Sequence, residues 1–262
     1  MSPDGTILWE RRDLIATALI DRPARRNALS AALCDELRVH LTEHRDLRAV
    51  VIGGAGDKAF CAGADLAVRA EDTGGLTHGG GDTFRPAFEA LLDEIVGFPA
   101  PVIAAVNGHA LGAGMQLAVA CDLRVVAPSA TFGIPAGRLG VAISAINVQR
   151  LVQAVGQPMA RDILLTARSL SAAEAASAGL VQRAADDALG AAVALASEVA
   201  ALAPISARAH KTMLTRVAIS GGLSAGDRAE LSGLEAEAFE STDLQEGLAA
   251  FNEKRPANFS GG

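Results

Sequence analysis

The sequence predicts an α/β fold that ends in an all-helical region. Over most of the chain, short apolar runs typical of buried strands alternate with segments whose apolar residues recur at helical spacing, and from about residue 186 onward only helical segments follow. The chain has 262 residues, of which 50% are hydrophobic, so it can bury a sizeable core. We therefore expect strands and helices to be interleaved first, with a helical region after them.

The first predicted elements are two strands and a helix. Ile7–Trp9 and Leu14–Ile20 are apolar runs separated by a charged turn, which is typical of strands. Ser30 has a side chain suited to cap a helix. Leucines recur behind it at helical spacing, at Leu33, Leu37 and Leu41.

The middle of the chain continues the alternation. Residues 68–85 are polar and rich in glycine, so we expect a surface loop there. The other expected elements are strands over Ala49–Gly53, Pro101–Val106 and Leu123–Val126, and helices over Pro86–Val96, Met115–Ala120 and Ile143–Val155.

The last third carries helix-start signals. Ser171 with Glu174 and Thr242 with Gln245 have the spacing of capping boxes. Long amphipathic segments follow near residues 186–202, 205–219 and 227–240. We therefore expect helices to make up this part of the chain.

Charge and composition exclude several classes of protein. The net charge of −7 argues against a nucleic-acid partner, which requires clustered positive charge. We find no apolar run of about 18 residues that would span a membrane, and the polar first 12 residues do not form a signal peptide. Three scattered cysteines indicate reduced thiols in a cytoplasmic protein.

One hydrolase-like motif is a weak signal. Gly222–Gly226 matches the G-x-S-x-G pattern around Ser224, but that motif requires a strand before it, and here a helical stretch precedes it. We interpret Ser224 as a loop residue or a helix cap. The sequence contains no H-E-x-x-H and no cysteine cluster, so we expect no metal site.

Two segments resemble the crotonase (enoyl-CoA hydratase/isomerase) superfamily. They are Lys58–Leu66, with the sequence KAFCAGADL, and Pro101–Arg124, which contains PVIAAVNGHALGAG followed by CDLR. Shorter family-like stretches lie at Arg22–Leu29, Thr131–Gly133, Gln149–Leu151, Ala178–Val181 and Phe251–Arg255. The match covers nearly the whole chain in order and spacing.

The resemblance implies a crotonase-like spiral of ββα turns over residues 1–195, which binds acyl-CoA, and a C-terminal helical trimerisation region over residues 196–262. It also implies an assembly that is a homotrimer or hexamer. It implies an acyl-CoA ligand, with coenzyme A as part of the substrate and no separate cofactor. By position, the backbone N–H groups of Ala64 and Ala113 would hold the thioester oxygen. Negative charge develops on that oxygen during the reaction, so donors aimed in advance stabilise it.

The resemblance also exposes a departure from the family pattern. Hydratases of this family hold water between two glutamates, and the matching positions here are Gln116 and Ala136. Neither an amide nor a methyl group can act as a general acid or base. General acid–base help is worth about 10²–10⁴ in rate, so losing both groups removes most hydratase activity.

The coenzyme A end of the site is predicted from the same resemblance. Arg25 and Arg26, with Arg22, are placed where family members meet the nucleotide. The backbone of residues 62–66, which includes Ala62, Asp65 and Leu66, would line the adenine and pantetheine path. Phe251 and Lys254 resemble residues that reach the nucleotide from a neighbouring subunit.

Three functional hypotheses follow. The first is a non-catalytic acyl-CoA binder, which acts as a carrier or regulator. The second is an active enoyl-CoA hydratase, isomerase or decarboxylase that uses other residues, with Gln116, Ser144 and His109 as candidates. The third, a serine hydrolase acting through Ser224, requires a fold that the surrounding sequence does not predict.

Overall fold

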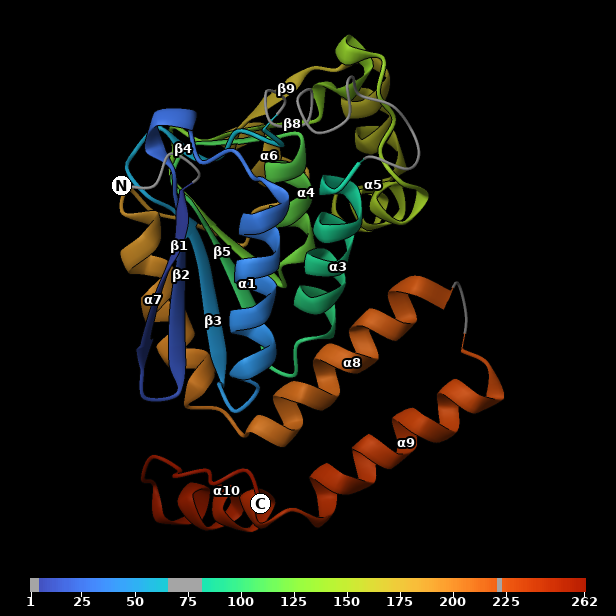
Figure 1. Ribbon diagram of the computed structural model, residues 1–262. Helices are drawn as coiled ribbons and strands as arrows, with labels where there is room; N and C mark the ends of the chain where they lie inside the picture. Colours follow the sequence, from blue (N-terminus) through green and yellow to red (C-terminus); the bar gives the residue numbers. More distant parts are fainter. Residues whose placement is uncertain (1–4, 66–81, 221–222) are drawn as a thin grey trace.

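The computed structural model describes residues 5–65, 82–220 and 223–262. A six-stranded sheet in the order β1-β2-β3-β5-β7-β10 forms its centre, with α1 and α3 on one face and α7 on the other (Figure 1). The strands are β1 (Thr6–Arg12), β2 (Ile15–Asp21), β3 (Ala49–Gly54), β5 (Val102–Val106), β7 (Leu123–Val126) and β10 (Arg183–Ala184).

The strands of this sheet are mostly parallel. β1 and β2 pair antiparallel, with Thr6 opposite Asp21, and β2, β3, β5, β7 and β10 then pair in parallel. All of β3 and β5 is buried because helices cover both faces of the sheet. Successive residues alternate between faces, so Val50 and Ile52 pack towards α1 and α3, whereas Ala49 and Val51 pack towards α7.

A second, four-stranded sheet lies at one end of the first. Its strands are β4 (Ala59–Cys61), β6 (His109–Leu111), β8 (Thr131–Gly133) and β9 (Ser169–Ser171), in that order across the sheet. None of these short strands was predicted, because three residues are too few to show a period. Their positions make the chain repeat a strand of each sheet followed by a helix, as β3–β4–α3, β5–β6–α4 and β7–β8–α5. The predicted spiral of ββα turns is therefore confirmed.

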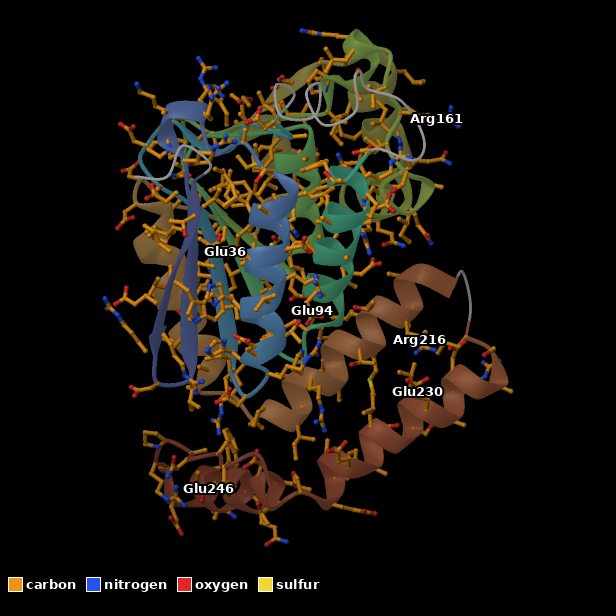
Figure 2. All side chains as sticks on the ribbon, in the orientation of Figure 1. Glu36, Glu94, Arg161, Arg216, Glu230 and Glu246 are labelled. Atoms are coloured by element: carbon orange, nitrogen blue, oxygen red, sulfur yellow. The ribbon has the colours of Figure 1, made fainter. Side chains whose placement is uncertain are left out.

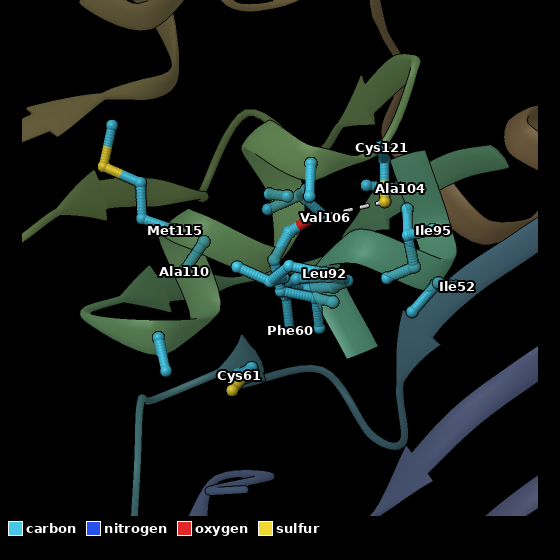
Figure 3. Close-up of a cluster of buried hydrophobic side chains, with 14 of the residues drawn as sticks. Ile52, Phe60, Cys61, Leu92, Ile95, Ala104, Val106, Ala110, Met115 and Cys121 are labelled. Carbon is cyan, nitrogen blue, oxygen red and sulfur yellow. Dashed lines mark hydrogen bonds between the residues drawn. The ribbon is translucent and has the colours of Figure 1, made fainter. Parts of the chain in front are cut away.

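The helices of the core are α1 (Ala31–Glu43), α3 (Phe84–Gly97), α4 (Ala113–Ala120), α5 (Ala145–Thr166), α6 (Ala172–Ser177) and α7 (Ala188–Ala200), with short 3-10 turns η1 (Pro23–Arg25) and η2 (Pro135–Leu139). Two helices have a limit close to the predicted one, α1 at its start and α5 at a break in its middle. The Ser30 hydroxyl caps α1 by accepting from Leu33 N, and α5 is interrupted by left-handed Gly156, one residue after the predicted end of that helix. Figure 3 shows the core that α3, α4 and the sheets enclose around Phe60 and Leu92.

The last three helices are α8 (Pro204–Ser220), α9 (Ala225–Glu240) and α10 (Thr242–Glu253), and Figure 1 shows α9 and α10 extending away from the sheet. Helix α8 stays in contact with the core, because its buried Lys211 donates to Ile95 O and Ala100 O, both at 3.0 Å. Residue 195, the predicted boundary, falls inside α7, which packs on the sheet as far as Val199. Arg216 on α8 pairs with Asp227 and Glu230 on α9 (Figure 2).

Local signals predicted two of the helix starts in this region. Ser171 and Glu174 form a capping box, and Ser224, expected to be either a loop residue or a helix cap, is a cap that forms another box with Asp227. The predicted start at Thr242 is one residue late, because the Ser241 hydroxyl accepts from Leu244 N. Within the described ranges, no single helix is both long and apolar enough to cross a membrane; α7 and α8 together pass only by length and composition and are bent by 111°.

Candidate active site

One cavity of about 270 Å³ lies where the second sheet meets the helices. Its lining comes from four stretches of chain: residues 62–64 after β4, residues 84–89 of α3, residues 111–116 at the start of α4, and residues 134–147 from η2 into α5. The predicted Ala62, Ala64, Ala113, Gln116, Ala136 and Ser144 all line it. The fold thus brings together residues that are far apart in sequence.

The first wall is the loop after β4. Leu29 N donates to Gly63 O and Asp65 N donates to Leu29 O, both at 2.8 Å, which pairs the loop with the segment before α1. In such a parallel bridge, the residue between the two bonded groups turns its own N–H away from the partner strand. Ala64 holds that middle place, and in the described part of the chain its N–H donates to no other group. The Ala64 amide is therefore available at the cavity.

The second wall is the start of α4, and it touches the first. A Cβ built on Gly63 would lie 3.1 Å from Leu111 O and 3.8 Å from Ala113 N, and one built on Gly112 would lie 3.8 Å from Gly63 Cα. Gly63 and Gly112 have φ values of 117° and 56°, which favour glycine. The two loops thus lie against each other, with little room for a side chain at Gly63 and a positive φ that favours glycine at both positions.

The N–H of Ala113 is free by its place in the helix. Ala113 is the first residue of α4, and the first N–H groups of a helix have no partner within it. The positive end of the helix dipole lies at the same point. Gly114 permits this arrangement, because a Cβ there would lie 2.0 Å from Cys61 O. Helix α4 can therefore sit against β4 with its first amide at the cavity.

The two positions of interest for proton transfer carry no carboxylate. Gln116 Nε2 donates to Gly112 O at 3.2 Å, one turn back in α4, and Ala136 contributes a methyl group from η2. Ser144 is the residue before α5, and its buried Oγ has no hydrogen-bond partner among the described residues. Asn147, 5% exposed, accepts from Arg150 Nη1 at 3.0 Å.

One polar side chain of the cavity was missed by sequence reasoning. Glu89 lies on α3 and is half-buried, and among the described residues it is the only carboxylate that lines the cavity. No motif marks it, because α3 reads simply as an amphipathic helix and its role as a wall appears only in three dimensions. His109, proposed from sequence, does not line the cavity; its Nδ1 lies 2.7 Å from Thr131 Oγ1 on β8.

The comparisons with known proteins agree over the whole chain. A model of the enoyl-CoA hydratase/isomerase family matches residues 10–262. The chain belongs to this family. A relative described as "Probable enoyl-CoA hydratase echA8" from Mycobacterium tuberculosis is 38% identical over 260 residues, covering 97% of this chain and 98% of the relative.

Solved structures of the enoyl-CoA hydratase/isomerase family share the fold. An enoyl-CoA hydratase/carnithine racemase from Magnetospirillum magneticum superposes with a TM-score of 0.88 at 33% identity, covering 98% of this chain and 96% of that one. An enoyl-CoA hydratase from Bacillus anthracis gives 0.86 at 31% identity, covering 98% and 99%. The crotonase fold expected from the two sequence motifs is thus confirmed.

The basic residues expected at the coenzyme A end of this family's site divide into two kinds. Arg25 and Arg26 are exposed on η1, and Arg26 O accepts from Ala62 N at 3.0 Å, so both lie next to the cavity loop. Arg22 differs from the expectation: it is 6% exposed, and its Nη1 lies 2.6 Å from Asp65 Oδ2. It faces the protein interior because Asp65 is buried there too.

The remaining predicted residues lie away from the cavity or outside the description. Leu66 falls in residues 66–81, outside the described ranges, as does most of the loop predicted over residues 68–85. Phe251 is 84% exposed and Lys254 ends α10, on the far side of the molecule from the second sheet (Figure 1). The predicted contact of these two residues with the nucleotide of a neighbouring subunit stays a prediction.

The three thiols are buried and protonated. Burial raises the pKa of Cys61 and of Cys121 to about 12 and raises the pKa of Cys34 as well, so all three are neutral near pH 7. Across the described ranges, no group of three or more His, Cys, Asp or Glu side chains could hold a metal ion.

Proposed function

We propose that this protein binds an acyl-CoA thioester, with the thioester oxygen held between the N–H groups of Ala64 and Ala113. The observation that carries the proposal is the contact between Gly63 and the Gly112–Ala113 turn. Two donors from separate loops that touch can reach one acceptor, whereas either loop alone would be an ordinary turn. Membership of the enoyl-CoA hydratase/isomerase family supports the same ligand.

The rest of the cavity suits an acyl chain. Side chains such as Phe84, Phe88, Leu139 and Ile143 supply apolar surface, with few polar groups among them. The exposed Arg25 and Arg26 beside the loop offer positive charge for the phosphates of coenzyme A. An apolar pocket with a cationic rim thus matches the two ends of the ligand.

Hydration by the usual family route is not part of the proposal. The family resemblance assigns the two glutamate positions to Gln116 and Ala136, both of which line the cavity, and neither side chain can activate water. The function we propose is therefore an acyl-CoA binder, a carrier or regulator, in place of an enoyl-CoA hydratase.

A second candidate is an enzyme that needs only enolate stabilisation or a carboxylate from another wall. Decarboxylation of a malonyl-type thioester is one such reaction, because loss of CO₂ leaves the carbanion on the substrate. The half-buried Glu89 in the cavity favours this second class. Steady-state assays with crotonyl-, 3-enoyl- and malonyl-type thioesters separate it from a pure binder.

Titration calorimetry tests the proposed ligand. Short- and long-chain acyl-CoA should bind, and free coenzyme A, which lacks the thioester carbonyl, should bind more weakly. The proposal fails if no acyl-CoA binds at high micromolar concentration.

Self-association into a homotrimer or hexamer is a further part of this proposal. The C-terminal helices expose large apolar side chains, including Leu214 at 71%, Phe239 at 68% and Leu248 at 58%. Exposed apolar area of this kind favours contact with a second surface. Phe251 and Lys254 would then reach a neighbouring copy's nucleotide. Light scattering after gel filtration measures the mass and tests this.

A further inference from the structure

The cavity contains a carboxylate on a different element from the family's usual positions. Glu89 projects from α3, whereas Gln116 belongs to α4 and Ala136 to η2. It lines the same cavity as the amides of Ala64 and Ala113. A group on α3 can therefore meet a ligand whose carbonyl is held at the other wall.

The environment of Glu89 leaves it free to react. It makes no ion pair and no hydrogen bond within residues 5–65, 82–220 and 223–262, whereas carboxylates such as Glu174, Glu198 and Glu246 pair with arginine at 2.8 Å or less. Arg85, one turn earlier on α3, also lines the cavity. A half-buried carboxylate that is not committed to a structural bond is suited to proton transfer.

The other polar groups of the cavity cannot take its place. The side-chain amide of Gln116 is too weakly basic to accept a proton, and its Nε2 donates to Gly112 O. Ser144 presents a hydroxyl, which is a weak base without a partner that takes its proton. Among the described lining residues, only Glu89 can both accept and return a proton.

We propose that Glu89 is the catalytic base of this cavity and removes a proton from the α-carbon of the bound acyl-CoA. This inference rests on the proposed ligand, and it favours the second candidate function, an enzyme with a carboxylate on another wall, over a carrier or regulator. A carboxylate oxygen forms the new O–H bond, the Cα–H bond breaks, and its electron pair forms the enolate double bond. The negative charge moves to the thioester oxygen, where the N–H groups of Ala64 and Ala113 stabilise it.

The same carboxylic acid then returns the proton. Return to the α-carbon restores the starting thioester, and with a 3-enoyl thioester, delivery to the γ-carbon moves the double bond to the 2-position. The substrate and product have the same atoms, and neither water nor an oxidant is consumed. The proposed substrate class is therefore an acyl thioester with an acidic α-proton, and no hydration step is involved.

Exchange of the α-hydrogens tests the inference directly. Butyryl-CoA is incubated with the full-length protein in D₂O, and deuterium at the α-carbon is followed by NMR. The wild-type protein should catalyse the exchange, and Glu89→Gln should slow it by about 100-fold or more while binding butyryl-CoA with similar affinity. Glu89→Asp keeps a carboxylate that is one methylene shorter and should retain measurable exchange.

Glu94→Gln is the matched control. It makes the same chemical change on the same helix, and Glu94 pairs with Arg45 and does not line the cavity. This variant should exchange deuterium at the wild-type rate. A general effect of charge loss on α3 would slow both variants equally and would overturn the inference.

The outcomes separate this inference from the proposed ligand. If the wild-type protein binds butyryl-CoA but exchanges no deuterium, or if Glu89→Gln exchanges as fast as wild type, Glu89 is not the base and the binding proposal stands. If calorimetry detects no acyl-CoA binding, both fail together.

Discussion

Arg22 and Asp65 form a buried ion pair that fixes the loop behind the cavity. Arg22 Nη1 lies 2.6 Å from Asp65 Oδ2, both side chains are 6% exposed, and Asp65 directly follows Ala64. Arg22 Nη1 also donates to Ala28 O at 3.4 Å. The pair therefore ties the turn before α1 to the loop that holds Ala64, the first proposed oxyanion donor.

Removing the positive charge of this pair should be costly. Arg22→Met leaves the Asp65 carboxylate buried without its guanidinium partner, which costs about 3–5 kcal/mol of the free energy of unfolding. Urea denaturation followed by circular dichroism measures the loss. Arg183→Met is the matched control, since Arg183 and Glu198 are 49% and 60% exposed, and such a pair contributes about 0–1 kcal/mol. Equal losses in the two variants would contradict the role given to the buried pair.

Removing one backbone donor should weaken ligand binding without disrupting the helix. Proline is tolerated at the first position of a helix, so Ala113→Pro deletes the N–H at the start of α4 and little else. We expect acyl-CoA affinity to fall by about tenfold or more, the equivalent of about 1.4 kcal/mol. Calorimetry with butyryl-CoA measures it.

The control for this variant is the same change at another helix start. Ala225 is the first residue of α9, is exposed, and follows the Ser224 cap. Ala225→Pro should leave acyl-CoA affinity unchanged. Unaltered binding by Ala113→Pro, in a protein with wild-type circular dichroism, would remove the Ala113 amide from the site.

Restoring a carboxylate should create some hydratase activity. Gln116 Nε2 donates to Gly112 O, a bond that an ionised glutamate cannot make, so the side chain of Gln116→Glu should turn from that carbonyl towards the cavity. One acid–base group is worth about 10²–10⁴ in rate, so we expect hydration of crotonyl-CoA at least about 100-fold above that of the wild-type protein. The loss of absorbance of the enoyl thioester follows the reaction. Gln153→Glu, on α5 outside this cavity, should add nothing.

The buried thiols should be unreactive until the protein unfolds. The pKa of Cys61 and of Cys121 is raised to about 12 by burial, and the thiolate is the reactive form. At pH 8, iodoacetamide should therefore leave the native protein unmodified and alkylate three cysteines in urea, as mass spectrometry would show. Rapid alkylation of a native thiol would indicate an exposed cysteine.

The raised pKa of the buried thiols also makes the free energy of unfolding depend on pH. Unfolded thiols ionise near pH 8.5, about where free cysteine does, whereas the folded ones keep their protons up to about 12. A raised folded pKa contributes stability that is fully present below the unfolded pKa and is lost as pH rises towards the folded pKa. The contribution of these groups to the free energy of unfolding should thus fall between about pH 8.5 and 12. Urea titrations of wild type and a Cys61→Ala, Cys121→Ala double variant over this range measure it.

The sequence by itself determined the interleaved strands and helices, the helix caps at Ser30 and Ser171, and the two glycine-rich loops of the family. Each depends on short-range patterns: apolar spacing, a capping hydroxyl, or small residues at a turn. The sequence also shows directly that positions 116 and 136 carry no glutamate.

Only the tertiary structure decided how those parts face one another. The strands of the second sheet are three residues long and exist because neighbouring strands supply their hydrogen bonds. The Arg22 side chain points inward because it pairs with the buried Asp65, which lies 43 residues later in the sequence. Glu89 lines the cavity because the spiral packs α3 against α4. Contacts between distant residues leave no periodic trace in the sequence, so neither fact could be deduced from it.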